Sequence, residues 1–280
     1  MVEVHKLDAA CGAEIRNADL SSALSSADLR IIRTAWMEHH VLVFPEQKLE
    51  NDDLVRFAEY LGPIGDDPFI KPIEEHDRIA AIHRKADETG RIFADNWHSD
   101  WSFMSTPPAG TFLYGIVIPP TGGDTYFSNQ HLAYESMQSD MKEKYEELLS
   151  IHSARTAYSR DGVYAKKNYD GTMNISVSDE ANEIQHHPLV RTHPESGKQG
   201  IFGGSYVVDF EGVEETRAKK IIEELVAWQD REEFVYRHKW KPNMLVLWDN
   251  RSVLHRASGG YEGYERRLHR LTIADSADYY

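Results

Sequence analysis

The feature that most constrains this fold is the short sequence around His98, because its chemistry requires a partner far along the chain. Residues 96–101 run Asn-Trp-His-Ser-Asp-Trp, with an imidazole at His98 and a carboxylate at Asp100. On a β-strand, residues two apart project from the same face, so we expect these two side chains to lie side by side. Together they make two-thirds of a facial metal site of the kind that holds non-haem Fe(II). His255 is the candidate for the third ligand, so the fold must return its C-terminal part to residues 96–101.

The spacing of His98 and Asp100 is weak evidence by itself, because the chain has 14 histidines and 46 acidic residues. The His-Pro-Glu sequence at 193–195 is a rival pair, but its proline is typical of a turn. The two histidines at 186–187 are another rival pair, but adjacent side chains on a strand face opposite ways and cannot easily bind one metal. No His-Glu-x-x-His sequence and no pair of cysteines is present, which removes the common zinc-hydrolase and structural-zinc patterns.

The composition is that of an ordinary globular protein, with 41% hydrophobic and 28% charged residues among 280. The net charge of −15 disfavours nucleic acid and anionic membranes as partners, because both select a basic surface. The net charge does not exclude a small anionic ligand, because salt screens the electric field of distant surface charges within about 8–10 Å. The single cysteine, Cys11, excludes an internal disulfide and fits a reducing compartment. With no signal-peptide pattern and no apolar run of about 20 residues, we expect a cytoplasmic protein.

Many short β-like segments, with helices between them, predict a mainly β fold with α decoration. The favoured architecture is a double-stranded β-helix, or jelly roll, in a single domain spanning residues 1–280. The polar segments 64–95 and 160–183 are expected to be flap loops beside the site, apart from the strand-like residues 79–82, because loops on a rigid scaffold carry specificity.

Helices are expected over residues 51–61, 130–150 and 213–229, the second as two short helices. Asn51 is the predicted N-cap of the first, and Gly62-Pro63 its stop.

Two arginines follow His255 in the C-terminal part of the chain. If residues 266–270 continue a strand, Arg266, Leu268 and Arg270 share one face. Two guanidinium groups aimed at one cavity repel each other unless anions bind there, and guanidinium suits the bidentate binding of carboxylates. A solvated basic edge strand is the alternative that this pattern leaves open.

Five motifs occur in order along the chain, and together they resemble one family. They are Trp97-His98-Ser99-Asp100, Gly122-Gly123-Asp124-Thr125, His187-Pro188-Leu189-Val190-Arg191-Thr192-His193-Pro194, Trp248-Asp249-Asn250-Arg251 with His255, and Arg266-x-x-x-Arg270. The sequence resembles the taurine dioxygenase / phenoxyacetate-herbicide dioxygenase family of Fe(II)- and 2-oxoglutarate-dependent oxygenases, over nearly its whole length.

The resemblance implies a role for individual residues. His98, Asp100 and His255 match the catalytic iron ligands. Arg266 matches the arginine that pairs with the distal carboxylate of 2-oxoglutarate, and Thr125 matches the hydroxyl that hydrogen-bonds to it. The cofactor is then Fe(II), with 2-oxoglutarate and O₂ as cosubstrates.

The resemblance also implies a substrate pocket. Arg270 matches the residue that holds the sulfonate or carboxylate of the prime substrate in relatives. Trp101, Tyr158 and Tyr206 match positions near the substrate, although core packing is an equal alternative for each. The flap sequence at 65–71 lacks the histidine and tyrosine with which the taurine enzyme engages its substrate, which weakens a taurine assignment.

The implied activity is hydroxylation of a small organic anion, phenoxyalkanoate-like or taurine-like, with formation of succinate and CO₂. Relatives form dimers or larger assemblies, so a homo-oligomer is expected. Two alternatives stay open on the same scaffold: a zinc-dependent hydrolase or isomerase, and a non-catalytic small-anion-binding protein. A requirement for ferrous iron and O₂ would distinguish them.

Overall fold

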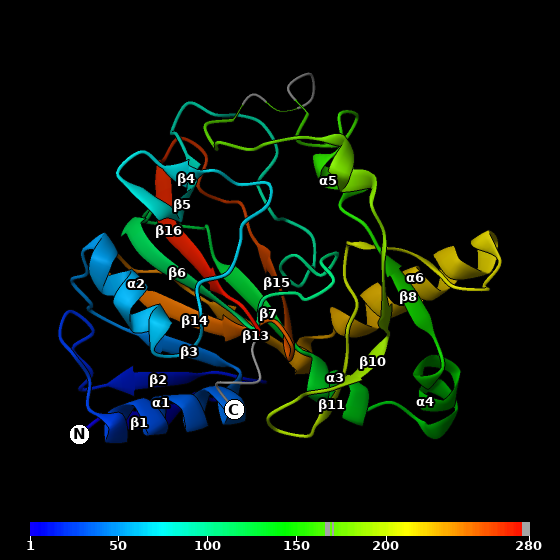
Figure 1. Ribbon diagram of the computed structural model, residues 1–280, viewed down its shortest axis with the longest axis horizontal. Coiled ribbons are helices and arrows are strands. Elements are labelled where there is room, and N and C mark those ends of the chain that lie inside the picture. Colours follow the sequence, from blue (N-terminus) through cyan, green and yellow to red (C-terminus); the bar gives the residue numbers. More distant parts are fainter. Residues whose placement is uncertain (166–168, 170, 276–280) are drawn as a thin grey trace.

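The structure, a computed structural model, describes residues 1–165, 169 and 171–275. Its largest element is an eight-stranded sheet, drawn across the left half of Figure 1. In spatial order its strands are β1 (Glu3–Lys6), β2 (Ala13–Arg16), β3 (Val41–Phe44), β14 (Leu245–Asp249), β6 (Gly110–Val117), β16 (Arg266–Ile273), β5 (His76–Arg84) and β4 (Pro72–Ile73).

Three smaller sheets complete the β structure of the described residues. They are β13 (Val235–His238) with β7 (Thr125–Asn129) and β15 (Val253–Ala257), β12 (Val207–Phe210) with β8 (Leu149–His152) and β9 (Gln185–Pro188), and the hairpin of β10 (Val190–Thr192) and β11 (Gln199–Ile201). The helices are α1 (Ser26–His39), α2 (Asn51–Glu59), α3 (Gln130–Glu135), α4 (Ser139–Glu146), α5 (Arg155–Tyr158) and α6 (Glu215–Gln229), with 3₁₀ turns η1 (Asp179–Asn182) and η2 (Glu232–Phe234).

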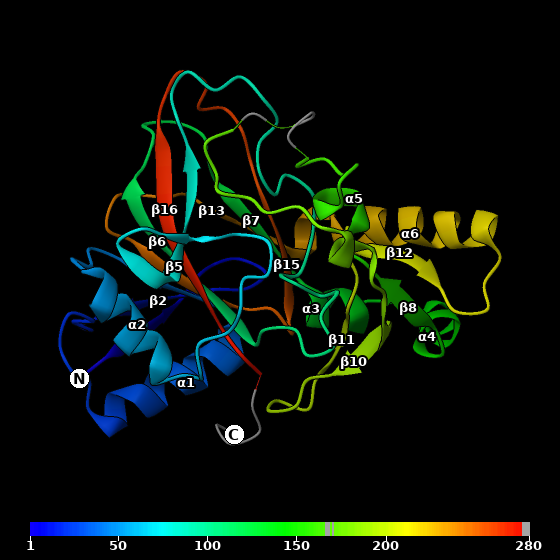
Figure 2. The same ribbon diagram turned by 45° about the horizontal axis from the view of Figure 1, so that its top comes forward.

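The central strands of the large sheet are buried on both faces, which is why β3 and β14 are continuous apolar runs. Along β14, Leu245 and Leu247 pack in the cluster that contains α1 and α2, whereas Val246 and Trp248 pack in the cluster with β7 and β15. Successive side chains point to opposite faces, so one strand supplies both cores. Figures 1 and 2 place α1 and α2 beside the large sheet and α6 on the other side of the molecule.

The predicted face of the C-terminal strand is confirmed. Arg266, Leu268 and Arg270 on β16 are buried, while Arg267 and His269 between them are only half-buried. Leu268 belongs to the same cluster as Trp248, so this face of β16 points toward β7 and β15. Both arginines therefore point into the interior between the two sheets.

The predicted helices form, with one correction at a cap. Helix α2 begins at Asn51, but its N-cap is Glu50, whose backbone N–H donates to Asp53 Oδ2 at 3.0 Å in a capping box. The prediction that Asn51 is the cap was wrong because the reciprocal Glu50–Asp53 pair satisfies two backbone donors at once. The two helices expected over residues 130–150 are α3 and α4.

The segment 64–95 contains β4 and the nine-residue strand β5, which pairs with β16. Part of the segment 160–183, residues 166–168 and 170, lies outside the described residues. None of the helices in the described part of the chain combines the length and apolar character needed to cross a membrane.

A buried ionic cluster fixes the turn between β14 and β15. His193 Nε2 lies 3.0 Å from Asp249 Oδ2, and Arg251 donates to both carboxylate oxygens at 2.8 and 2.9 Å. Burial alone would raise the pKa of Asp249, but the charge of Arg251 and the hydrogen bond from His193 lower it below its ordinary value. The stabilisation is therefore present at neutral pH and is lost as acid protonates the carboxylate. The turn that follows leads directly into β15, which carries His255.

We predict that Asp249→Ala lowers the free energy of unfolding by about 3 kcal/mol, because it removes one side of a buried charge pair. Chemical denaturation measures this loss. The matched control is Lys219→Ala, which breaks the exposed pair with Glu215 and is expected to leave the denaturation midpoint unchanged. Equal midpoints for the two variants would contradict the role given to the cluster.

Candidate active site

Two backbone hydrogen bonds join the histidines of the predicted metal site. The His98 N–H donates to the His255 carbonyl at 3.0 Å, and the His255 N–H donates to the His98 carbonyl at 2.8 Å. The pair forms an isolated antiparallel bridge between the segment before β6 and strand β15. As a result the two imidazole rings lie with their centroids 4.1 Å apart.

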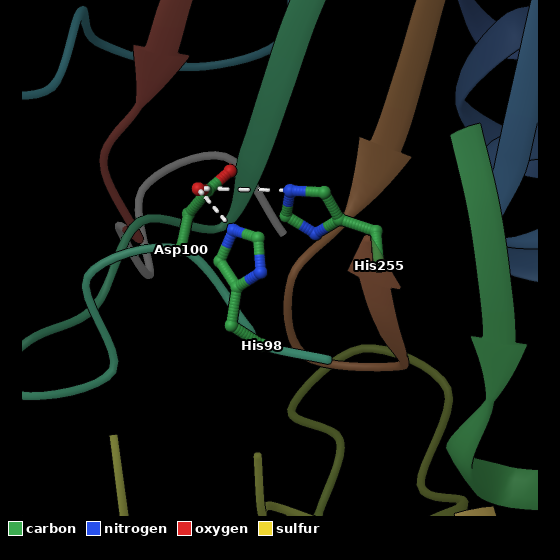
Figure 3. Close-up of side chains that lie close together, drawn as sticks. All are labelled: His98, Asp100 and His255. Carbon is green, nitrogen blue, oxygen red and sulfur yellow. Dashed lines mark ion pairs between the residues drawn. The ribbon is translucent and has the colours of Figure 1, made fainter. Parts of the chain in front are cut away.

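The carboxylate of Asp100 completes the group. Its Oδ1 lies 3.7 Å from His98 Nε2 and 3.8 Å from His255 Nε2. One ligand atom from each residue falls within 4.8 Å of the other two, and all three residues are buried. Figure 3 shows the two Nε2 atoms turned toward the same carboxylate oxygen. Three converging N and O donors can hold one ion about 2 Å from each of them.

The prediction that residues 96–101 form a strand was wrong, although the side chains do converge. Apart from the bridge at His98 the segment is irregular, and a turn begins at Asp100 and includes Trp101, whose φ is +48°. The turn, rather than strand alternation, brings Asp100 to the side of His98. Gly204, at φ +104°, packs on this segment, and a Cβ there would lie 3.0 Å from His98 Cα. Only glycine combines this backbone conformation with so close an approach.

The charge state of Asp100 suits a metal ligand. Burial alone would raise its pKa, but the charges of Arg270 and of the two histidines hold the pKa below its ordinary value. Its Oδ2 accepts hydrogen bonds from Thr111 Oγ1 at 2.7 Å and from Arg270 Nη1 at 3.1 Å. These two donors occupy Oδ2, so Oδ1 is the oxygen directed at the imidazoles.

The histidines are also in the state that metal binding requires. Burial lowers the pKa of both His98 and His255, so both imidazoles are neutral near pH 7. His98 Nδ1 lies 2.8 Å from the carbonyl of Asn96, which places the proton on Nδ1 and leaves the Nε2 lone pair facing Asp100. His255 Nδ1 is buried without a hydrogen-bond partner among the described residues.

A second layer of hydrogen bonds supports the carboxylate. Asn250 donates to Thr111 Oγ1 at 2.9 Å and accepts from Trp248 Nε1 at 2.9 Å, while its carbonyl accepts from Ser99 at 2.8 Å. Sequence reasoning assigned no role to Thr111 or Asn250. The Trp248-Asp249-Asn250 motif was the available signal, because a polar run after a buried strand often orients a site.

A single pocket brings together every site residue that the sequence predicted. It is lined by His98, Asp100, His255, Thr125, Arg266, Arg270, Trp101, Tyr158 and Tyr206, together with apolar side chains that include Ile70, Ile82, Leu113 and Val163. The three metal-ligand candidates lie in one wall, and the two arginines come from β16.

Arg266 is a buried cation that forms no ion pair with any described residue, and its Nε has no hydrogen-bond partner. Burial lowers its pKa, but an arginine stays charged. Gly123 makes room for it, since a Cβ there would lie 2.9 Å from Arg266 Nε. Thr125 Oγ1 accepts from Trp240 Nε1 at 3.0 Å, which leaves the hydroxyl proton for another acceptor. These groups fit the carboxylate of a 2-oxoglutarate molecule.

The charge of Arg270, in contrast to that of Arg266, is compensated by two carboxylates. Its Nη1 contacts Asp100 as described, and its Nε and Nη2 lie 3.2 and 3.1 Å from Asp67 Oδ1. The guanidinium also lies over the ring of Trp101, 5.3 Å from the centroid. Sequence reasoning missed Asp67, because nothing local in the segment 64–71 indicates a contact with β16.

Aromatic side chains gather around the pocket, and Tyr158 and Tyr206 belong to its lining. Phe69 stacks on Tyr158 with centroids 4.7 Å apart, and Tyr206 stands edge-on to His98 at 6.1 Å. Burial raises the pKa of Tyr158 and Tyr206, so both phenols are neutral. These aromatic side chains give this part of the pocket an apolar surface.

Comparison with known proteins decides among the alternatives. The profile of the family described as "Taurine catabolism dioxygenase TauD, TfdA family" matches residues 3–272. The chain belongs to this family. It is an α-ketoglutarate-dependent dioxygenase, an oxidoreductase that uses Fe(II), 2-oxoglutarate and O₂.

Individual relatives span nearly the whole chain. The alpha-ketoglutarate-dependent 2,4-dichlorophenoxyacetate dioxygenase of Cupriavidus pinatubonensis is 32% identical over 95% of this chain and 95% of its own. An alkylsulfatase of Acinetobacter baylyi is 30% identical over 98% of this chain and 85% of its own. The crystal structure of a taurine dioxygenase from Burkholderia xenovorans has a TM-score of 0.79 at 27% identity, covering 98% of this chain and 90% of that one.

We predict that His255→Ala abolishes stoichiometric Fe(II) binding, because two donors remain where three converge. Anaerobic metal analysis after desalting measures the bound iron. His186→Ala, at an exposed histidine, is the matched control and is expected to bind iron normally. Full iron occupancy in His255→Ala would remove this residue from the ligand set.

Proposed function

We propose that this dioxygenase hydroxylates a small organic anion, a carboxylate or sulfonate, whose charged group binds Arg270. The observation that carries the proposal is the position of the Arg270 guanidinium. It is buried in the pocket wall and hydrogen-bonded to Asp100, the carboxylate of the metal-ligand group. An anion on this guanidinium would have its adjacent C–H bonds beside the metal position. The relatives named for 2,4-dichlorophenoxyacetate and alkyl sulfates support the same substrate class.

In this proposal His98, Asp100 and His255 hold the iron, and Arg266 with Thr125 holds the distal carboxylate of 2-oxoglutarate. When bound, iron, 2-oxoglutarate and O₂ supply C–H hydroxylation with formation of succinate and CO₂. The protein contributes position and electrostatics. The hydrogen bond from Asn96 keeps the His98 lone pair on Nε2, and Thr111 keeps Asp100 Oδ1 directed at the metal position.

The substrate body would lie against Trp101, Tyr158 and Tyr206. Apolar walls exclude water, and a low local dielectric strengthens the charged contacts of the two arginines. This arrangement favours an anion that carries apolar groups.

We further infer that the core is a double-stranded β-helix, because β6, β14 and β16 of one sheet pack on β7 and β15 of another. We also propose one domain over residues 1–280, in which the parts of segments 64–95 and 160–183 outside strands β4 and β5 act as flaps. A cytoplasmic location and a homo-oligomeric state remain predictions. The zinc-dependent hydrolase and the non-catalytic binding protein are disfavoured by the family membership.

The direct test of the substrate class is a panel assay for substrate-triggered succinate release and O₂ uptake. Phenoxyacetate, alkyl sulfates and alkanesulfonates would be compared with neutral analogues such as 2-phenoxyethanol. We expect only anions to stimulate turnover. Equal stimulation by a neutral analogue would contradict the proposal.

We predict opposite kinetic effects for the two arginines. Arg266→Ala should raise the KM for 2-oxoglutarate, and Arg270→Ala the KM for the substrate, each about 10–100-fold. This range corresponds to about 1.5–3 kcal/mol for a charge-assisted contact. Steady-state kinetics with each substrate varied in turn measures the effect. The reverse pattern would mean that the two roles are interchanged.

A further inference from the structure

The carboxylate of Asp67 holds the Nε/Nη2 edge of Arg270, and it lies outside the lining of the substrate pocket, to which Arg270 itself belongs. Its Oδ1 accepts from Arg270 Nε at 3.2 Å, from Arg270 Nη2 at 3.1 Å and from Trp101 Nε1 at 2.6 Å. The Nε and Nη2 hydrogens of arginine form the parallel pair that suits a carboxylate or sulfonate. The side chain of Asp67 is only 12% exposed, so this contact is internal.

The segment that carries Asp67 is anchored on both sides. The Gly65 N–H donates to the carbonyl of Thr272 at 2.8 Å, and the carbonyl of Phe69 accepts from the Ser176 N–H at 2.8 Å. Phe69 in turn stacks on Tyr158 in the pocket wall. The carboxylate of Asp67 is therefore held in place by the fold rather than by its own ion pair alone. The adjacent Asp66 is exposed.

The charges around Arg270 do not favour an added anion. Asp67 and Asp100 both contact the guanidinium and use three of its five N–H donors. A substrate anion on the remaining donors would lie near both carboxylates in a buried site, where like charges repel strongly. The charge of Arg270 is thus already compensated, and its attraction for a substrate anion is weakened.

We propose that Asp67 is a specificity-determining residue that weakens the binding of the substrate's anionic group to Arg270 by compensating the charge of its guanidinium. The proposal rests on the proposed function, in which Arg270 holds that group. Because the two carboxylates limit the affinity that Arg270 can contribute, much of the affinity must come from the body of the substrate. The apolar lining, which includes Ile70, Tyr158 and Tyr206, supplies it through burial. The substrate is therefore an anion with a sizeable apolar or aromatic body, and compact polar anions bind poorly.

The test is Asp67→Asn, which keeps an oxygen acceptor for Trp101 and removes the charge that compensates Arg270. Asp66→Asn is the matched control, since it removes the same charge one residue away. Anaerobic calorimetry on the Fe(II)- and 2-oxoglutarate-loaded protein would titrate phenoxyacetate, hexanesulfonate and the neutral 2-phenoxyethanol. We expect Asp67→Asn to bind at least one of the two anions ten or more times more tightly than the wild type. Its affinity for 2-phenoxyethanol and 2-oxoglutarate should be unchanged, and Asp66→Asn should match the wild type.

An unchanged or weaker affinity of Asp67→Asn for both anions overturns the proposal. So does an equal gain for 2-phenoxyethanol, which would indicate a wider pocket rather than a freed guanidinium. Thermal unfolding and 2-oxoglutarate binding confirm that the variant is folded, and Asp67→Ser replaces it if the asparagine variant is not.

The double variant Asp67→Asn/Arg270→Met separates this proposal from the proposed function. If the gain persists without Arg270, an effect of Asp67 through Arg270 is excluded. If Arg270→Met alone binds anions as the wild type does, the anchor assigned in the proposed function is wrong instead. The expected result is loss of the gain in the double variant and loss of anion binding in the single one.

Discussion

The reciprocal backbone hydrogen bonds between His98 and His255 are the contact on which the site depends. They join a segment that precedes β6 to a strand near the end of the chain. Strand β15 also pairs with β7, which begins at Thr125, so one small sheet carries a metal-ligand candidate and a cosubstrate candidate. The facing strand β16 supplies both arginines. The pocket is thus the space between two sheets, and its position is set by the packing of those sheets.

The buried charged groups in this space differ in the partners that they bind. The two carboxylate oxygens of Asp100 have different partners. Oδ2 accepts hydrogen bonds from Thr111 and Arg270, and Oδ1 faces the imidazoles. Arg266 has no ion pair among the described residues, while Arg270 has two. A buried cation without a counterion is costly, so the first arginine is suited to an anion that is always required. Arg270, whose charge is already paired, is suited to a substrate anion that must be distinguished from other anions.

Much of this arrangement could be predicted from sequence, because the signals are local and periodic. The alternation on β16 correctly placed Arg266 and Arg270 on one face, and the stop signal Gly62-Pro63 correctly marked the end of the α2 region. The His98–Asp100 spacing led to the right side chains for the wrong reason, since a turn rather than a strand positions Asp100. Asp67 and Gly204 could not be found this way. Their roles depend on a packed contact between segments distant in sequence, which no local pattern encodes.

The central claim is that one ferrous ion binds between three side chains brought together by the fold. Anomalous X-ray diffraction at the iron edge, on crystals loaded anaerobically with Fe(II) and 2-oxoglutarate, tests it directly. The account predicts one strong peak in contact with His98 Nε2, His255 Nε2 and Asp100 Oδ1. A peak at any other set of side chains, or none at these three atoms, would contradict it.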